Sequence, residues 1–528
     1  MKQVKLLDCT LRDGGYINDW NFGHSTMISI YKRLDESGVD FIEIGFLDDR
    51  REFDPNRSIQ PNTNCYNKIY AGIQKKNAIP IAMIDFGTCD ISNLADAKDS
   101  FIDGIRVIFK KDKIDKALPF CKAIKDKGYK LFIQAISITT YSDIEMLEYI
   151  QKINDVHPYA FSIVDTYGLL NDKSMSHYFD LFDNNLLPDI KIGYHGHNNF
   201  QLAFSNTAKF LEQPTKRTIV GDATVYGMGK SAGNCAIELL AMYLNDAFGT
   251  NYDINQYLEI FDTDLSQIYK EHYWGYNYNF YISAMQKCHP NYVQYLLDKK
   301  TLTITDINSI LSNIPQDIKL LYSKEYIEKA YTDYQSRAID DSVSIRELSE
   351  ILAGKNILLI GPGNSIVKEY KKIALYIKEN NPVIISVNFN PTSYTSDFIF
   401  LSNAKRYTSL LDTNINDSSL IITSNITDYA NKAKYVLNYA SSLRENTEKS
   451  DNALLLLLNN LCRFGIKHVA LAGFDGYIKN VQNYSDPSYD FAGNEAYKVK
   501  NNAIIAESIK KISKDIGIEF ITKTLYKY

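Results

Sequence analysis

The chain has 528 residues, 45% of them hydrophobic and 23% charged, which excludes a long disordered protein and suggests about two to four domains. Its net charge of −5 excludes a globally basic surface for nucleic acid or an anionic membrane. No apolar run reaches about 18 residues and no signal sequence is recognisable, so we expect no membrane span. The seven cysteines form no CxxC pair, and we therefore expect reduced thiols and a cytoplasmic protein.

Residues 1–250 alternate short β-branched segments with amphipathic ones. Strand-like segments lie at 4–9, 41–46, 79–86, 104–110, 130–137, 159–166, 191–197 and 217–225. Helix-like segments between them include 24–37, 114–127, 143–155, 200–212 and 234–248. Eight such units at this length predict an α/β fold, the parallel (β/α)8 TIM barrel, with an open doubly wound sheet as the alternative.

Two further regions follow the predicted barrel. Residues 251–345 are aromatic-rich without strand alternation, which predicts a helical extension and linker that is either a lid or the interface of a homo-oligomer. From 346 to 528 a second α/β pattern has strand-like segments at 356–361, 383–388, 398–401, 420–424, 468–473 and 519–522. This pattern predicts a separate Rossmann-like domain.

Residues that carry chemistry gather where the predicted barrel strands end, which is where TIM barrels place their active sites. In chain order they are Asp8, Arg12, Asp13, Glu43, Thr166, His195, His197, Gly229 and Asn234. His195 and His197 are two residues apart on a strand, so both side chains point to one face. With Asp13 they form a mixed nitrogen and oxygen donor set for Mn²⁺, Fe²⁺, Co²⁺ or Zn²⁺, unless the histidines are satisfied within the core.

Arg12 would lie beside that ion. Its guanidinium can hold a carboxylate with two hydrogen bonds or stabilise an enolate oxygen. The alternative is a structural salt bridge with Asp8 or Glu43, and the two roles are compatible. The glycine-rich turn before Asn234 is either an anion site or a tight turn with a helix cap.

Three motifs stand in order along the chain: Asp8-x-Thr10-Leu11-Arg12-Asp13-Gly14, His195-x-His197-Asn198, and Gly227-x-Gly229 with Ala232-Gly233-Asn234. Together they resemble the DRE-TIM metallolyase superfamily, which includes 4-hydroxy-2-oxovalerate aldolase, HMG-CoA lyase and isopropylmalate synthase. The resemblance is greatest with the aldolase-type members. It implies a metal-dependent aldolase that makes or breaks a carbon–carbon bond through the metal-stabilised enolate of pyruvate or a related 2-oxo acid, with an aldehyde as second substrate.

The resemblance also implies a role for each residue. Asp13, His195 and His197 would bind the divalent ion, with Mn²⁺ as the first choice and Mg²⁺, Co²⁺ or Zn²⁺ as alternatives. Asn234 would be a fourth ligand or would orient one. Arg12 would hold the 2-oxo acid, which Thr166 and Gly229 would also contact, and Glu43 and Asp8 would orient Arg12.

The chain departs from the family after Arg12 and Asp13. The synthases show Gly-Glu-Gln there, whereas Gly14-Gly15-Tyr16 stands here, which argues against an acyl-CoA synthase. The aldolases carry a basic histidine where this chain has Tyr16, and a tyrosine serves as a base only with a lowered pKa. His289 and Tyr292 are the other candidates, unless both only pack helices. An acyl-CoA-using Claisen lyase or synthase, and a non-catalytic barrel that scaffolds the second domain, are the alternative functions.

In the second domain a glycine turn follows the first strand. Gly361, Gly363 and Ser365 of this turn could cradle a phosphate, but Ile366 replaces the third glycine of the dinucleotide fingerprint. With Asn388 after the next strand, the pattern resembles the nucleotide-binding domains of hydroxymethylpterin diphosphokinase-like and bacterial sialyltransferase-like groups. It predicts a nucleotide or nucleotide-sugar ligand, with a domain that binds nothing as the alternative. Such a module beside an aldolase suits surface-carbohydrate biosynthesis.

Overall fold

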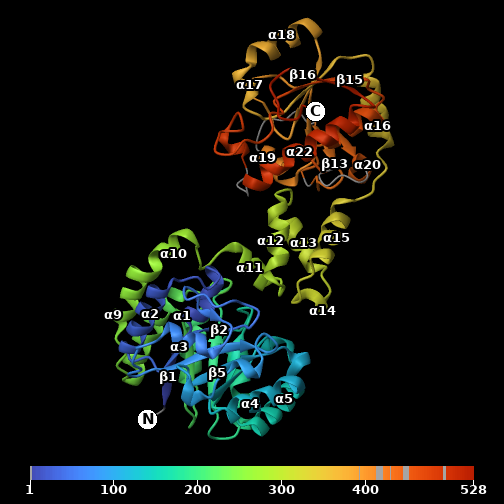
Figure 1. The fold of residues 1–528 in the computed structure, drawn as a ribbon. Coiled ribbons are helices and arrows are strands. Elements are labelled where there is room, and N and C mark those ends of the chain that lie inside the picture. The colour runs from blue at the N-terminus through green and yellow to red at the C-terminus, as the bar shows by residue number, and fades with distance from the viewer. Residues whose placement is uncertain are drawn as a thin grey trace. The chain divides into compact units, whose positions relative to one another are not determined.

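The computed structural model describes residues 3–391, 393–411, 420–428, 430–443, 451–490 and 495–527. The chain divides into two compact units, Met1–Pro290 and Asn291–Tyr528, which we treat one at a time (Figure 1). The boundary falls inside the segment predicted as a helical extension, and the division at 250 and 345 remains a prediction. Within the described ranges, no helix is long and apolar enough to cross a membrane.

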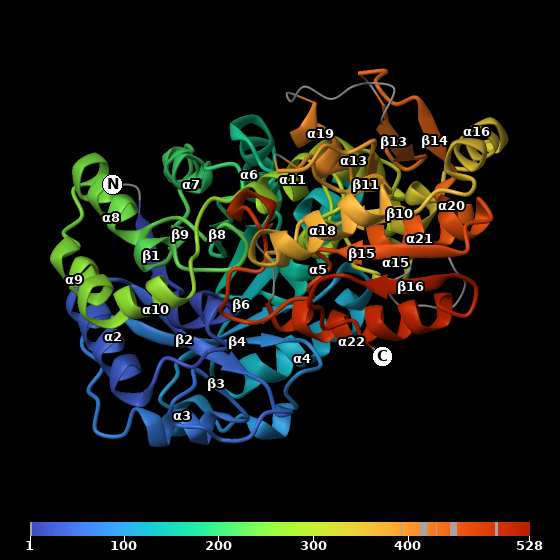
Figure 2. The ribbon, with the colours of Figure 1, turned by 90° about the horizontal axis from the view of Figure 1, so that it is seen from above.

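The first unit is a closed barrel of eight parallel strands, as predicted. The strands are β1 (Val4–Asp8), β2 (Phe41–Leu47), β4 (Ile79–Asp85), β5 (Gly104–Ile108), β6 (Lys130–Ala135), β7 (Ala160–Asp165), β8 (Lys191–Gly196) and β9 (Ile219–Ala223). Each pairs with the next, and β1 pairs with both β9 and β2, which closes the sheet. Figure 2 shows β1, β9 and β8 side by side. The two-residue strand β3 (Ile59–Gln60), not predicted, extends the sheet beside β2.

Helices cover the outside of the barrel. They are α2 (His24–Glu36), α3 (Thr63–Ile69), α4 (Ile114–Asp126), α5 (Asp143–Val156), α6 (Asp172–Asn185), α7 (Ala203–Glu212) and α8 (Ile237–Phe248). The short helix α1 (Thr10–Asp13) follows β1 at the carboxyl end of the barrel. Three more helices complete the unit: α9 (Ile254–Glu259), α10 (Ser266–Glu271) and α11 (Tyr278–Met285).

Side-chain alternation along the strands decides which residues reach the barrel interior. Leu7 of β1 and Phe41 of β2 belong to one apolar cluster inside the barrel, whereas Leu6 packs with the surrounding helices. Glu43 is two residues from Phe41 and therefore points inward. Asp8 is two residues from Leu6 and therefore points outward.

The second unit is built on a seven-stranded parallel sheet, which confirms the predicted second α/β domain. Its strands are β10 (Ile357–Ile360), β11 (Val383–Val387), β12 (Phe398–Leu401), β13 (Leu420–Thr423), β14 (Tyr435–Leu437), β15 (His468–Ala472) and β16 (Gly517–Phe520). Their order in the sheet is β14-β13-β12-β11-β10-β15-β16, and Figure 2 shows β10, β15 and β16 next to one another. This order is that of a doubly wound fold.

Helices cover both faces of this sheet. One face packs against α16 (Ser342–Leu352), α21 (Ala453–Arg463) and α22 (Glu495–Ile512), and the other against α18 (Tyr370–Asn380). The remaining helices are α12 (Pro290–Lys299), α13 (Ile304–Ser312), α14 (Gln316–Lys319), α15 (Lys324–Gln335), α17 (Ser365–Lys368), α19 (Ala404–Leu410) and α20 (Tyr439–Ser442).

Candidate metal centre and active site

Arg12 and Asp13 lie on a tight turn directly after β1. The Asp13 N–H donates to the Cys9 carbonyl at 2.8 Å, and the Trp20 indole donates to the Arg12 carbonyl at 2.8 Å. A side chain at Gly15 would overlap the ring of Trp20, so only glycine lets the indole lock the turn. The turn therefore holds both charged side chains, each buried, over the mouth of the barrel.

Asp13, His195 and His197 come together as predicted. One ligand atom from each lies within 4.8 Å of the other two, and all three side chains are buried. The two imidazole rings have centroids 5.0 Å apart, and His197 Nε2 is 3.8 Å from Asp13 Oδ2. The spacing of two along β8 thus aims both histidines at the carboxylate.

Hydrogen bonds orient the three side chains so that ligand atoms face one another. His197 Nδ1 donates to the Asp165 carbonyl at 2.9 Å, and its buried Nε2 has no hydrogen-bond partner among the residues that the structure describes. Asn234 Nδ2 donates to Asp13 Oδ2 at 2.7 Å, and within the same residues its buried Oδ1 has no partner either. Buried polar atoms without partners are rare in folded proteins. Two such acceptors beside a carboxylate fit a divalent cation.

The protonation states also suit a cation. Burial alone would raise the pKa of Asp13, but Arg12 and the two histidines hold it well below its usual range. Desolvation lowers the pKa of His197 to about 4. At neutral pH the site therefore offers an anionic carboxylate and a neutral imidazole, the forms that bind metal ions.

A second set of three groups, Cys9, His195 and Asp222, is equally close together. Burial raises the pKa of the Cys9 thiol well above its ordinary value, so it stays protonated. Arg106 already donates to Asp222 at 2.5 Å. The Asp13 set is therefore the better cation site.

A network of buried charges beneath the site was not predicted. Arg106 of β5 is fully buried and donates to Glu43 Oε2 at 3.2 Å and to Asp222 Oδ2 at 2.5 Å. Glu43 in turn accepts from Arg12 Nε at 2.6 Å, and Asp222 lies 3.1 Å from His195 Nδ1. Arg106 thus links the carboxylate that holds Arg12 to the carboxylate that holds His195. A signal was present in the sequence, because Arg106 and Asp222 are single charges inside apolar strands.

Asp8 does not orient Arg12, contrary to the expectation. Because it points outward, its carboxylate accepts from the backbone N–H and the hydroxyl of Thr10, at 2.9 and 2.6 Å. Burial raises the pKa of Asp8 to about 7. Asp8 thereby stabilises the turn that carries Arg12, and Glu43 alone of the two carboxylates contacts the guanidinium.

Gly229 and Thr166 lie at the ends of β9 and β7. A side chain at Gly229 would overlap Asn234 Nδ2 and lie 2.6 Å from Asp13 Oδ2, so the glycine lets the loop approach the two residues. The next residue, Lys230, donates its backbone N–H to Asp13 Oδ2 at 3.1 Å. Thr166 Oγ1 accepts from the Ser137 N–H at 2.7 Å. Their contacts with a substrate remain predictions.

The three candidate bases differ in their surroundings. Tyr16 is half exposed, and desolvation followed by the charge of Asp13 raises its pKa to about 12, the opposite of what a base needs. Tyr292 belongs to the second unit and donates its hydroxyl to the Leu321 carbonyl at 2.8 Å, so it is structural. His289 is half buried, and desolvation and the charge of Lys230 lower its pKa.

The glycine turn of the second unit is closed, contrary to the prediction of a phosphate cradle. Ser365 directs its backbone N–H and its hydroxyl to the carboxylate of Asp475, the N–H at 2.7 Å. Side chains at Gly361 or Gly363 would lie within 2.6 Å of the Gly473 carbonyl, so these glycines serve close packing of two loops. Gly363 and Asn388 both line one cavity of this unit.

Comparison with known proteins supports a single family for the barrel. The HMGL-like family model matches residues 3–263. Oxaloacetate decarboxylase of Mycobacterium tuberculosis is 23% identical over 45% of this chain and 69% of its own length. The 4-hydroxy-2-oxovalerate aldolase of Pseudoalteromonas translucida is 24% identical over 48% of this chain and 73% of its own length. The 2-isopropylmalate synthase of Sulfolobus acidocaldarius is 24% identical over 49% of this chain and 66% of its own length.

Among solved structures, HMG-CoA lyase from Brucella melitensis is 15% identical, with a TM-score of 0.41, over 51% of this chain and 100% of its own. Each of these named relatives aligns with about half of the chain, and the family model ends before the second unit begins. The barrel is an HMGL-like domain of the DRE-TIM metallolyase superfamily.

Proposed function

We propose that the barrel is a divalent-metal-dependent aldolase that makes or breaks a carbon–carbon bond through the enolate of pyruvate or a related 2-oxo acid. The observation that carries the proposal is the set of Asp13, His195 and His197, with the unpartnered acceptors of His197 and Asn234, beside a buried arginine. A divalent ion held there would supply a Lewis acid that draws charge from the keto oxygen. Two relatives, a 4-hydroxy-2-oxovalerate aldolase and an oxaloacetate decarboxylase, are named for 2-oxo acids.

Arg12 has one guanidinium nitrogen left for a substrate. Glu43 holds Nε, Asp13 holds Nη1, and the buried Nη2 has no hydrogen-bond partner among the described residues. A buried, charged donor fixed at two of its three nitrogens is pre-oriented for an anion. We assign Nη2 to the carboxylate or the enolate oxygen of the oxo acid.

Two side chains, Tyr16 and His289, have different roles toward the substrate in this proposal. Since its pKa is raised, Tyr16 serves as a hydrogen-bond donor that stays protonated. His289 is the neutral imidazole that we assign to the hydroxyl of the aldehyde adduct, because its lowered pKa keeps it uncharged at neutral pH. We take Mn²⁺ as the first ion to test, since the donor set mixes nitrogen and oxygen. The second substrate is an aldehyde, and we propose a sugar aldehyde of surface-carbohydrate biosynthesis.

The test is exchange of the methyl protons of pyruvate with heavy water, followed by NMR with and without Mn²⁺. The proposal predicts exchange that needs the ion, stops with a chelator and is lost in Arg12→Ala. Arg51→Ala, which removes an exposed ion pair with Asp19, is the matched control and leaves the rate unchanged. Exchange of the acetyl methyl of acetyl-CoA instead of pyruvate would favour the Claisen alternative. Bound metal with no exchange of pyruvate, 2-oxobutyrate or acetyl-CoA would overturn the proposal and favour the scaffold.

A further inference from the structure

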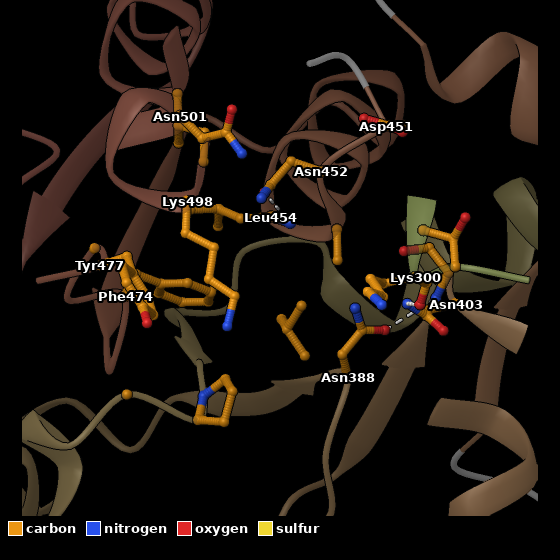
Figure 3. Close-up of a pocket in the computed structure, with 18 of the residues that line it drawn as sticks. Lys300, Asn388, Asn403, Asp451, Asn452, Leu454, Phe474, Tyr477, Lys498 and Asn501 are labelled. Carbon is orange, nitrogen blue, oxygen red and sulfur yellow. Dashed lines mark hydrogen bonds between the residues drawn. The ribbon is translucent and has the colours of Figure 1, made fainter. Parts of the chain in front are cut away.

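The second unit contains a cavity of about 760 Å³, within the usual size range of small-ligand sites. It lies where β10, β11, β12 and β15 end, and its walls include Pro362, Asn388, Asn403 and Phe474 (Figure 3). The chain runs from β10 to β11 on one side and from β15 to β16 on the other. In open parallel sheets this divergence of connections opens the crevice in which ligands bind.

The two sides of the cavity differ in chemistry. Figure 3 shows Phe474 and Tyr477, from the loop after β15, on one side and Asn388 with Asn403 on the other. Lys498 of α22 lies across the Tyr477 ring at 4.8 Å from its centroid and pairs with Asp490 at 2.7 Å. An aromatic wall with a cation beside it is a surface on which a planar base stacks.

Amide groups on the walls are left for a ligand. Asn388 has a left-handed backbone (φ 60°), and its Oδ1 accepts from the Ser402 N–H at 3.1 Å, which leaves its Nδ2 as a donor. Asn501 Oδ1 is buried and has no partner among the described residues. In dinucleotide-binding sheets an acidic side chain beyond the glycine turn hydrogen-bonds a ribose hydroxyl, and the amide of Asn388 is the polar group in the comparable place here.

Charges of both signs line the cavity: the carboxylates of Asp298, Asp451 and Asp475, and the cations Lys299, Lys300, Arg406 and Lys498. Lys300 lines the cavity and, within the described ranges, has no carboxylate within salt-bridge distance. Desolvation and then the charge of Lys300 lower the pKa of Lys405, which lies in the first turn of α19 between the lining residues Asn403 and Arg406. Neither lysine has a salt bridge among the described residues, and two neighbouring lysines in this state favour an anionic ligand. The closed glycine turn cannot take that anion, because the Asp475 carboxylate occupies it.

We propose that this cavity binds a nucleotide, with its base against Phe474 and Tyr477, its ribose at Asn388 and its phosphate toward Lys300. A nucleotide sugar also contains a base, a ribose and a phosphate, so the same residues could bind it. This site is independent of the metal centre of the barrel.

The experiment is isothermal titration calorimetry of the full chain, in EDTA, with AMP, GMP, CMP and UMP, their diphosphates and the uridine and guanosine diphosphate sugars. Free nucleosides and inorganic phosphate are titrated separately. Lys300→Gln removes the charge at constant length. Asn388→Gly removes the amide at a position where glycine accepts the positive φ. Lys371→Gln is the matched control, because Lys371 is an exposed residue of α18.

We expect at least one nucleotide to bind with a Kd below about 1 mM, and each variant to weaken it about tenfold while the control does not. Tighter binding of a sugar diphosphate than of its nucleoside diphosphate would identify the nucleotide sugar as the source. No binding by any nucleotide, equal binding by inorganic phosphate, or a Kd unchanged in both variants would overturn the proposal. A titration of His195→Ala without EDTA separates the two sites, since we expect this variant to lose the barrel metal and to bind the nucleotide as the wild type does.

Discussion

Replacing Arg106 by methionine tests the buried charge network most sharply. Arg106 is fully buried and donates to both Glu43 and Asp222. Methionine keeps much of the volume and removes the charge. The two carboxylates then remain buried without the cation, and breaking buried ion pairs in this way costs about 3–5 kcal/mol. We expect the free energy of unfolding of the barrel to fall by that amount at pH 8.

The loss should also depend on pH. Burial alone would raise the pKa of Asp222, and Arg106 followed by His195 lowers it below its ordinary value. Without Arg106, desolvation dominates and the folded-state pKa of Asp222 rises above that of the unfolded chain. The variant then gains stability relative to the wild type as pH falls from 8 toward 4, because the folded state takes up the proton more readily.

Tryptophan fluorescence in urea is the assay, since both tryptophans, Trp20 and Trp274, belong to the first unit and report on the barrel alone. The control is Arg51→Met, which breaks an exposed pair with Asp19 and should cost at most about 1 kcal/mol. A loss in Arg106→Met no larger than in this control, or one that does not shrink at acid pH, would refute the reasoning.

Three further predictions concern the metal centre. Gly229→Ala should weaken Mn²⁺ binding about tenfold or more by calorimetry, because the new methyl group would displace Asn234 and Asp13; unchanged affinity would show that the loop yields freely. In EDTA, His197 should cost the chain about 3 kcal/mol of stability as pH falls from 6.5 to 4, since only the unfolded state takes up that proton. Urea titrations of His197→Asn beside the exposed His272→Asn check this, and parallel pH profiles in wild type and His197→Asn would contradict it. Tyr16→Phe should leave the shape of the pH–rate profile of pyruvate exchange unchanged between pH 6 and 10, because the pKa of Tyr16 is about 12; loss of a basic limb would make Tyr16 the base.

Much of the barrel could be predicted because its signals are local. Each strand is a short β-branched segment, and the spacing of two between His195 and His197 places both on one face whatever the rest of the chain does. The turn that carries Arg12 and Asp13 follows β1 directly, so its place at the carboxyl end of the barrel follows from the strand alone.

The rest depends on contacts between distant segments. Asp8 lies within the same motif as Arg12, but whether it faces inward depends on the register of the whole barrel, in which it shares the outward face of Leu6. Likewise, the glycine turn at Gly361 has the local form of a phosphate cradle. Its anion is Asp475, which is more than 100 residues away in sequence. Arg106, Glu43 and Asp222 lie on β5, β2 and β9, so their contacts form only when these three strands have taken their places in the barrel.

The central claim is that Asp13, His195 and His197 hold a divalent ion on which a 2-oxo acid is bound. Pulsed EPR of the Mn²⁺-loaded chain with [2-¹³C]pyruvate tests it directly. We expect nitrogen couplings from two histidines, which are lost together with the bound Mn²⁺ in His195→Ala and in His197→Ala, and a ¹³C coupling from pyruvate. Bound Mn²⁺ without nitrogen couplings, or without any coupling to pyruvate, would contradict it.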